Sequence, residues 1–305
     1  MVTPGAEAGI ALGEAPDPRP GPGRPVVGVR AVSLNRGEVK GLVTGAEGAV
    51  PGWDLAGEVV EAATDGTGPS PGTRVVGMVG AGAWAERVAV PTSFLAALPD
   101  EVSFADAATL PVAGLTAHRA IQVGDRCVEG RVLVTGAAGG VGHFAVQLAG
   151  HLGGVVTAVV GRAERGAELE RLGATSVAVG MPSEGEYDLV LESVGGASLA
   201  AALRMVTPGG CVVSYGCSSG EDTTFDVRSF YSRSGARLQG LQLFPELQRA
   251  GPDAAAHDLD TLARMLAAGR LEAQIGLEVG WHQAAEAATA LLDRRVVGKA
   301  VLHIE

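Results

Sequence analysis

A glycine-rich turn between an apolar run and an amphipathic stretch constrains this chain more than any other feature. It lies within Arg131–Gly153, RVLVTGAAGGVGHFAVQLAGHLG. Apolar side chains follow the turn at helical spacing, at Val141, Phe144, Leu148 and Leu152. A strand, a tight turn and a helix that starts inside the glycines aim backbone N–H groups and a positive helix end at one point, which suits a pyrophosphate. The segment therefore predicts a dinucleotide-binding βαβ unit.

The small residues of this turn match the dinucleotide fingerprint with one change. Ala137, Gly139 and Gly142 fill its three small positions, so an alanine replaces the first glycine. A second apolar run, Val155–Gly161, follows where the next strand of such a unit would lie. A glycine turn in some other α/β fold is the alternative, but the strand before the turn and the helix after it favour dinucleotide binding.

Length and charge narrow the class of protein. A chain of 305 residues, 47% hydrophobic, is long enough for two domains with ample cores. Its net charge of −11 disfavours a nucleic acid or an anionic membrane as the main partner. Three cysteines without a CxxC motif build neither a disulfide framework nor a four-cysteine zinc site. With no apolar run near the roughly 20 residues that span a bilayer, a cytoplasmic location is expected.

Short strand-like runs separated by Gly and Pro dominate the first third of the chain. They lie at Val26–Leu34, Leu55–Ala62, Arg74–Val79 and Trp84–Val90. This pattern predicts an antiparallel or barrel-like β domain. Helical spacing over Asp100–Ala120 predicts a helical bridge to the next domain.

Strands and helices then alternate as far as Phe244. Six strands are expected, at Val132–Thr135, Val155–Val160, Ser176–Val179, Asp188–Ser193, Cys211–Gly216 and Leu238–Phe244. With helical stretches between the first five, they predict a doubly wound parallel sheet and an α/β fold class. Two helices and a last strand are expected at the end of the chain, at Leu259–Ala268, His282–Asp293 and Gly298–Ile304.

Nine stretches occur in an order and spacing typical of one superfamily. They are Ser33–Lys40, Pro51–Val60, Gly82–Pro91, Leu98–Ala117, Thr135–Gly142, Leu172–Val177, Asp188–Gly196, Pro208–Gly216 and Gly298–Leu302. Together they make the chain resemble the medium-chain dehydrogenase/reductase superfamily, most closely its zinc-free quinone oxidoreductase (ζ-crystallin-like) and enoyl reductase branch. The resemblance implies a GroES-like β-rich catalytic domain, residues 1–117 and 258–305, and a Rossmann domain, residues 118–257.

The resemblance also raises the question of zinc. Zinc-dependent relatives carry Cys where this chain has Asn35, and a His-Glu pair where it has Trp53 and Asp54. An indole cannot ligate a metal, and an amide oxygen is a poor zinc ligand. We therefore expect no metal, and acceptors that are already activated, such as quinones and α,β-unsaturated carbonyls.

The end of the second Rossmann strand indicates which nicotinamide cofactor is used. An NAD site needs Asp or Glu there, but this chain has Gly161 and Arg162, with Arg165 in the following turn. A guanidinium pairs bidentately with a 2′-phosphate, so NADPH is the expected cofactor. The alternative is that both arginines are merely solvated, and Glu164 in the same turn would weaken the phosphate preference.

Other expected site residues follow from the strand ends and from the resemblance. The further cofactor contacts are Thr116, Ala138, Gly139, Gly140, Val141, Ser193, Val194, Tyr215, Gly216, Cys217, Ser218, Leu241, Gln242 and Leu243. The resemblance places Asn35 near the nicotinamide and the substrate carbonyl, as the catalytic residue. Lys40 and Trp53 are the expected substrate contacts, the alternatives being a surface lysine and a core tryptophan.

These observations predict an NADPH-dependent oxidoreductase that transfers a hydride to a quinone or an α,β-unsaturated carbonyl without zinc. A dedicated biosynthetic enoyl or carbonyl reductase is the first alternative, and a non-catalytic NADPH-binding protein is the second. No clustered basic residues support a nucleic-acid partner, and Arg294-Arg295 is too small a patch. By resemblance, a homodimer is expected through the apolar last Rossmann strand, Leu238–Phe244.

Overall fold

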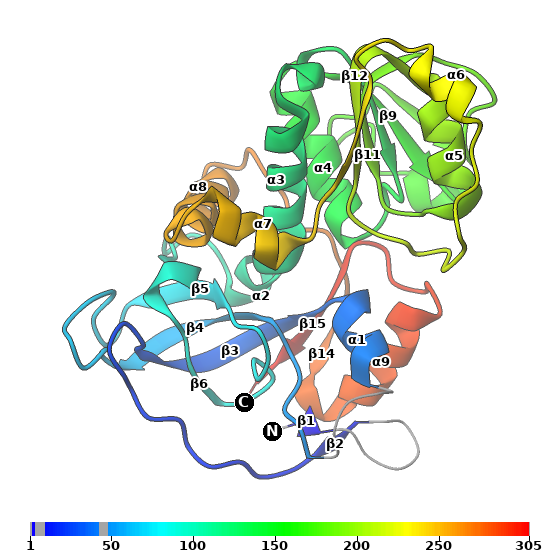
Figure 1. Cartoon of the computed structure of the whole chain (residues 1–305). Helices are drawn as coiled ribbons and strands as arrows, with labels where there is room; N and C mark the ends of the chain where they lie inside the picture. Colours follow the sequence, from blue (N-terminus) through cyan, green and yellow to red (C-terminus); the bar gives the residue numbers. More distant parts are fainter. Residues whose placement is uncertain (1, 4–9, 43–47, 305) are drawn as a thin grey trace. The chain divides into compact units, whose positions relative to one another are not determined.

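The computed structural model describes residues 2–3, 10–42 and 48–304, which form two compact units (Figure 1). The first unit contains Met1–Leu115 and Leu247–Glu305, and the second contains Thr116–Glu246. The second boundary falls within helix α7 (Leu243–Ala250), earlier than the position after residue 257 that the sequence suggested. Both units combine a β-sheet with helices, which confirms the predicted α/β class.

A mixed β-sheet forms the core of the first unit. The strands follow the order β14-β15-β3-β4-β5-β7, and β6 pairs with β3 outside this path. Every pairing is antiparallel except β14 with β15. The strands are β3 (Val26–Leu34), β4 (Asp54–Glu61), β5 (Arg74–Met78), β6 (Arg87–Ala89), β7 (Leu95–Ala97), β14 (Ile275–Gly280) and β15 (Lys299–His303). A separate pair joins β1 (Val2–Thr3) to β2 (Ala11–Leu12).

Two expectations for this sheet need correction. Strand β6 is shorter than the expected Trp84–Val90, because the N–H of Trp84 donates to Pro51 O (2.9 Å) and not to a neighbouring strand. Strand β14 was not predicted at all. Its glycines and alternating exposed residues give a weak apolar pattern, and its pairing with β15 defines it as a strand.

The helices of the first unit lie beside this sheet. They are α1 (Arg36–Leu42), α2 (Phe104–Ala108), α8 (Ala254–Ala267) and α9 (Ala284–Leu292), with 3₁₀ turns at Thr92–Phe94 and Trp281–Gln283. Arg36 joins α1 to α9, because its Nη1 donates to the terminal carbonyls of Leu291 (3.1 Å) and Leu292 (2.9 Å). Leu291 O also accepts from Arg294 N (3.2 Å), so the guanidinium adds to the hydrogen bonds that satisfy this helix end.

The expected helical bridge is not one helix. It is divided into α2, a π-helical turn over Leu110–Gly114, and α3 (Leu115–Gly124). Pro111 lies in the first turn of the π segment, and the N–H of Val112 donates to the Asp54 carboxylate (3.0 Å). A proline and a side-chain acceptor at adjacent positions interrupt the regular helical ladder, which accounts for the change in helix type.

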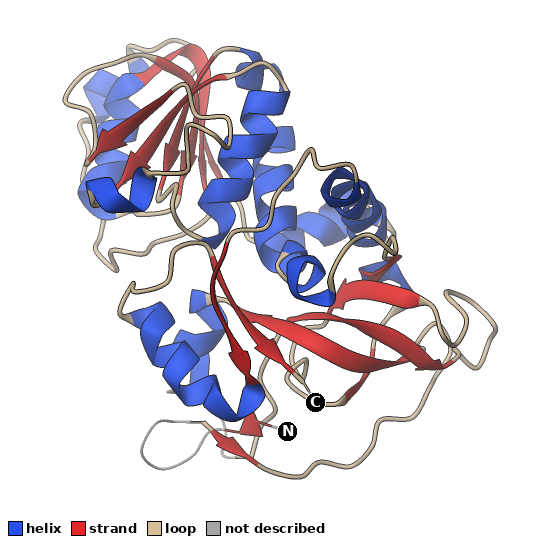
Figure 2. Ribbon diagram, turned by 180° about the vertical axis from the view of Figure 1, so that it is seen from behind, coloured by secondary structure: helices blue, strands red, loops and turns tan. Residues whose placement is uncertain are grey.

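A six-stranded parallel sheet forms the core of the second unit (Figure 2). Its order, β10-β9-β8-β11-β12-β13, is that of a doubly wound dinucleotide-binding fold, as predicted. All five pairings are parallel. The strands are β8 (Arg131–Thr135), β9 (Val155–Val160), β10 (Ser176–Val179), β11 (Tyr187–Glu192), β12 (Val206–Ser214) and β13 (Arg237–Gly240).

The helices between these strands are fewer than expected. Long helices follow only β8 and β11, namely α4 (Gly140–His151) and α5 (Gly196–Met205). A 3₁₀ turn at Ala163–Gly166 and further turns follow β9, and residues 180–186 between β10 and β11 contain no helix. A 3₁₀ segment at Asp125–Glu129 precedes β8, and the short helix α6 (Val227–Tyr231) precedes β13.

The last parallel strand ends earlier than predicted. The sequence suggested a strand through Phe244, but β13 stops at Gly240 and the chain enters helix α7 at Leu243. Pro245 occupies the first turn of α7, where a missing N–H costs nothing. Leu243 is therefore a helical residue and not a strand end. In the part of the chain that the structure describes, every helix is too short or too polar to cross a membrane.

Candidate active site

The glycine turn of the second unit forms an uncapped helix N-terminus. Gly139 precedes α4 with extended backbone, and no side chain caps this helix. A β-carbon on Gly142 would lie 2.3 Å from Gly136 O, so only glycine allows the turn to fold this tightly. The N-terminus of a 12-residue helix without a side-chain acceptor is suited to an anionic ligand such as a pyrophosphate.

A buried carboxylate organises the loop beside this turn. Glu192 ends strand β11, and its Oε1 accepts bonds from Val194 N (2.9 Å) and Ser198 Oγ (3.0 Å). Its Oε2 accepts from Gly195 N (3.0 Å). Sequence reasoning missed this residue, although an acid that closes an otherwise apolar strand is a usable signal. Glu192 holds the expected cofactor contacts Ser193 and Val194 at the carboxyl edge of the sheet.

Two strand-end loops lie side by side at this edge, as the sequence suggested. The N–H of Tyr215 donates to Glu192 O (3.0 Å), and that of Ser218 donates to Ser193 O (3.1 Å). Gly216 and Cys217 lie between them and are exposed. Ligands of doubly wound sheets bind outside the carboxyl ends of the strands, so this arrangement is compatible with a cofactor.

Tyr215 carries an unpartnered polar group at this edge. Its hydroxyl oxygen is buried and forms no hydrogen bond among the described residues, although the Ser193 hydroxyl, which donates to Thr135 O (3.0 Å), lies near it. Burial, together with the charge of Glu192, raises the pKa of Tyr215, so it remains a neutral donor. Buried hydroxyls normally have partners, and a bound dinucleotide would supply one here.

We predict opposite effects of Tyr215→Phe on stability and on cofactor binding. Removal of an unpartnered hydroxyl should leave the free energy of unfolding unchanged or slightly higher in urea titrations. The affinity for NADPH, the expected cofactor, should fall about threefold to tenfold in a fluorescence titration, because one hydrogen bond is lost. Tyr231→Phe, at an exposed tyrosine, is the control, and unchanged NADPH affinity in Tyr215→Phe would contradict the assignment.

The remaining expected cofactor residues are placed as follows. Gly161 and Arg162 are exposed just after β9, and Arg165 lies in the 3₁₀ turn beyond them. Thr116 is buried at the start of α3. Three residues follow β13: Leu241 and Leu243 are buried, and Gln242 is exposed. Ala138, Gly140 and Val141 lie in the turn or at the start of α4.

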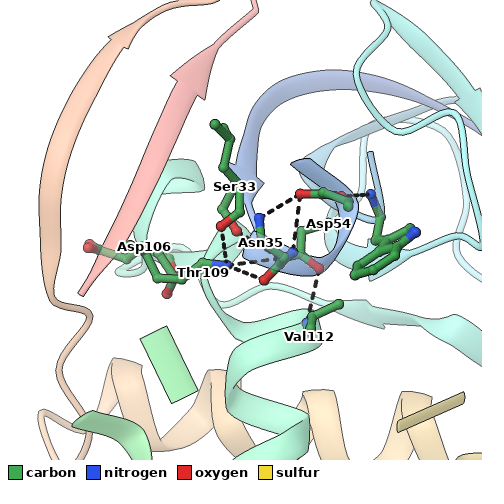
Figure 3. Close-up of polar contacts among 10 residues, drawn as sticks. Ser33, Asn35, Asp54, Asp106, Thr109 and Val112 are labelled. Atoms are coloured by element: carbon green, nitrogen blue, oxygen red, sulfur yellow. Dashed lines mark hydrogen bonds and ion pairs between the residues drawn. The ribbon is translucent and has the colours of Figure 1, made fainter. Parts of the chain in front are cut away.

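A buried polar cluster occupies the first unit (Figure 3). We call it the Lys299 cluster, and it contains Ser33, Asn35, Glu38, Asp54 and Lys299. The ammonium of Lys299 donates to Leu34 O (3.0 Å), Asn35 Oδ1 (2.6 Å) and Asp54 Oδ2 (3.3 Å). The side chains of Lys299 and Asp54 are 3% and 0% exposed, so this is an ion pair removed from water.

The Asp54 carboxylate is the hub of this cluster. Its Oδ2 also accepts from Ser33 Oγ (2.8 Å) and Asn35 Nδ2 (2.8 Å), while Oδ1 accepts from Val112 N (3.0 Å). A charged acceptor with four donors is strongly favoured in a low-dielectric site. Asp54 therefore connects strands β3, β4 and β15 to the π-helical turn (Figure 3).

Glu38 is a second buried carboxyl group that the sequence reasoning missed. Its Oε1 accepts from Asn35 N (2.6 Å) and its Oε2 from Trp53 N (2.9 Å). Burial, followed by the charge of Asp54, raises the pKa of Glu38 to about 8. The position lies one helical turn after Asn35, which is the capping signal that could have revealed it.

The structure surrounds the Asn35 amide with polar partners. Its Nδ2 faces Asp54 Oδ2 (2.8 Å) and Glu38 Oε1 (3.4 Å), and its Oδ1 accepts from Lys299. A donor to a substrate oxyanion would need an amide hydrogen that has no acceptor, and both hydrogens of this amide already face carboxyl groups. Two of these partners, Asp54 and Lys299, are distant in the sequence, and no motif along the chain links them to Asn35.

The two expected substrate residues differ in exposure. Trp53 is half-buried, and its ring covers Gly37 of α1, where a β-carbon would lie 3.2 Å from Cη2. Lys40 is exposed in the last turn of the same helix. The exposure of Lys40 fits a plain surface lysine as well as it fits a substrate contact. The half-buried ring of Trp53 can instead form one wall of a substrate site.

We predict that Lys299→Met lowers the free energy of unfolding by about 3–5 kcal/mol, because it leaves the Asp54 carboxylate buried without a cation. Urea or guanidinium titrations measure this loss. Lys40→Met, at an exposed lysine, controls for the change of residue type and should cost far less. Equal stability of Lys299→Met and the unaltered protein would contradict the central role of the ion pair.

Comparisons with known proteins agree with this architecture. Residues 21–100 match the family model "Alcohol dehydrogenase GroES-like domain", and residues 169–302 match "Zinc-binding dehydrogenase". The chain is 34% identical, over 92% of its length, to the spectinabilin polyketide synthase system protein NorB of Streptomyces orinoci, of which it spans 13%. It is 36% identical to the chloroplastic quinone-oxidoreductase QR1 of Triphysaria versicolor, over 61% of this chain and 64% of that protein.

A solved structure extends the comparison to the whole chain. The yhdH oxidoreductase from Salmonella enterica, in complex with NADP, superposes with a TM-score of 0.79 at 26% identity, covering 100% of this chain and 99% of that one. Fold and relatives define a class of protein that combines a GroES-like unit with a doubly wound nucleotide-binding unit. The chain belongs to the medium-chain dehydrogenase/reductase superfamily, in its quinone oxidoreductase branch, as predicted.

The described residues do not fit the zinc ion that the second family description mentions. Among them, no three His, Cys, Asp or Glu side chains gather in a way that could hold a metal ion. Asn35 and Asp54 instead bind the ammonium of Lys299. No step of the reaction is therefore assigned to a metal.

Proposed function

We propose that this chain is an NADPH-dependent reductase that transfers a hydride to a quinone or to an α,β-unsaturated carbonyl without zinc. The uncapped glycine turn at the start of α4 is the observation that carries the proposal. The unpartnered Tyr215 hydroxyl lies at the same sheet edge. The relative crystallised with NADP supports the choice of cofactor.

Named residues of the second unit hold the cofactor in this proposal. The N–H groups of Gly139, Gly140 and Val141 bind the pyrophosphate, and Arg162 binds the 2′-phosphate. Glu192 keeps the Ser193 loop in place beside Tyr215. The bound cofactor supplies the hydride, so the contribution of the protein is mainly positioning.

Asn35 acts in this proposal as a positioning residue for the substrate side. Its amide is fixed between Lys299 and the carboxyl groups of Asp54 and Glu38, and in this proposal it forms part of the wall of the substrate site beside Trp53. The enolate oxygen of a reduced enone then needs backbone N–H groups or water for stabilisation. An enone takes the hydride at its β-carbon and a proton from water at its α-carbon, and a quinone takes a hydride and a proton to give a hydroquinone.

Turnover assays test this proposal directly. We predict that NADPH absorbance falls in the presence of phenanthrenequinone or a simple enone, with one acceptor reduced for each NADPH consumed. Arg162→Ala should raise the KM for NADPH and hardly change that for NADH, because only NADPH carries the 2′-phosphate. Tight NADPH binding without turnover of any acceptor would favour a non-catalytic nucleotide-binding role.

A second candidate is a dedicated biosynthetic enoyl reductase. The 34% identity to NorB, a polyketide synthase system protein, over 92% of this chain favours it. Such an enzyme would reduce an α,β-unsaturated thioester. A crotonyl thioester of N-acetylcysteamine that is reduced with a much higher kcat/KM than any quinone would select this candidate over the first.

We also propose a cytoplasmic homodimer that forms through β13. This strand is the edge of the parallel sheet, its four residues are exposed, and Leu238 is 42% exposed. An exposed edge strand presents unpaired backbone N–H and C=O groups, which favour pairing with a second copy. Light scattering should give a molar mass twice that of one chain, and Leu238→Lys should lower the measured mass to that of the monomer. A monomer mass for the unaltered protein would contradict the dimer. Cell fractionation tests the proposed cytoplasmic location.

A further inference from the structure

We propose that Glu164 lowers the selectivity of this chain for NADPH over NADH by competing with the 2′-phosphate for Arg162. This inference rests on the proposed use of NADPH. It assigns a specificity-determining role to a residue that the dinucleotide fingerprint does not include. The result is a reductase that accepts both nucleotides, with a preference set by one carboxylate.

The two side chains form an ion pair on the surface of the second unit. Arg162 directly follows β9, and its Nε lies 3.6 Å from Oε1 of Glu164. The side chains are 63% and 71% exposed, so both charged groups are accessible to a ligand. The carboxyl end of the second strand is where the adenosine ribose of a dinucleotide binds in this fold.

The surface around this pair is open. A β-carbon on Gly161 or on Gly180 would meet no atom within 4 Å. The N–H of Gly180 donates to Val160 O (2.8 Å), which holds the end of β10 next to the end of β9. A ribose and its 2′ substituent therefore have room beside Arg162 and Glu164.

The two cofactors make opposite demands on this pair. A 2′-phosphate is a dianion that needs the guanidinium, so Arg162 must exchange its ion pair with Glu164 for one with the phosphate. The Glu164 carboxylate also repels the phosphate. A free 2′-hydroxyl instead donates a hydrogen bond to a carboxylate, which Glu164 supplies. The same two residues therefore offer a site to each nucleotide and weaken the discrimination that Arg162 alone would give.

Glu164→Gln tests this inference in binding experiments that need no acceptor substrate. Nicotinamide fluorescence titrations measure the Kd values for NADPH and NADH at low ionic strength. We expect the ratio Kd(NADH)/Kd(NADPH) to rise about 1.5-fold to fivefold, the range of an exposed ion pair. The increase should shrink at high salt, because exposed charges are screened.

A matched control and a double variant sharpen the test. Glu168→Gln removes another exposed glutamate, which pairs with Arg171 (2.8 Å), and should leave the ratio unchanged. In an Arg162→Gln background, Glu164→Gln should change the ratio less, because the competition for the guanidinium is removed while the repulsion of the phosphate and the hydrogen bond to the 2′-hydroxyl remain. An equal change in both backgrounds would mean simple repulsion and would overturn the competition.

The outcomes separate this inference from the proposed function. An unchanged or lower ratio in Glu164→Gln, with NADPH still bound, overturns the role of Glu164 alone. Failure of the unaltered protein to bind either nucleotide overturns the proposed function as well. Binding without turnover leaves the selectivity result valid, since the titrations do not depend on catalysis.

Discussion

The buried pair of Lys299 and Asp54 is the interaction on which the first unit depends. An ammonium and a carboxylate removed from water are tolerated only when each has its partner and further hydrogen bonds. Here the ammonium has three oxygen acceptors and the carboxylate four donors. Strands β3, β4 and β15 can therefore close around these charges only in one register, and the same carboxylate fixes the π-helical turn at Val112.

The second unit holds its own buried acid by hydrogen bonds from neighbouring backbone and hydroxyl groups. Glu192 is fully buried, and backbone N–H groups and hydroxyls are its donors. Charge-assisted bonds of this kind fix the geometry of a loop more firmly than neutral ones. The loop they fix lies at the edge where the glycine turn and Tyr215 are found, so a fold constraint and a binding site share the same residues.

Local patterns predicted most of the fold, and the failures have physical causes. The central strands of the parallel sheet, β8 and β11, were found because both of their faces are largely buried, which leaves continuous apolar runs. Strand β14 was missed because its pattern is weak without its neighbour β15. The predicted strand through Phe244 was wrong because apolar residues serve equally in a strand and in an amphipathic helix, and Pro245 suits a helix start.

The sequence by itself determined the nucleotide-binding turn, the order of the strands and the superfamily, because glycines and apolar periodicity act through neighbours in the chain. Only the tertiary structure decided what Asn35 can do. Its oxygen meets the ammonium of Lys299, 264 residues away, through the antiparallel register of β15 on β3. Which polar groups meet across a sheet depends on that register, and a motif read along the chain does not contain it.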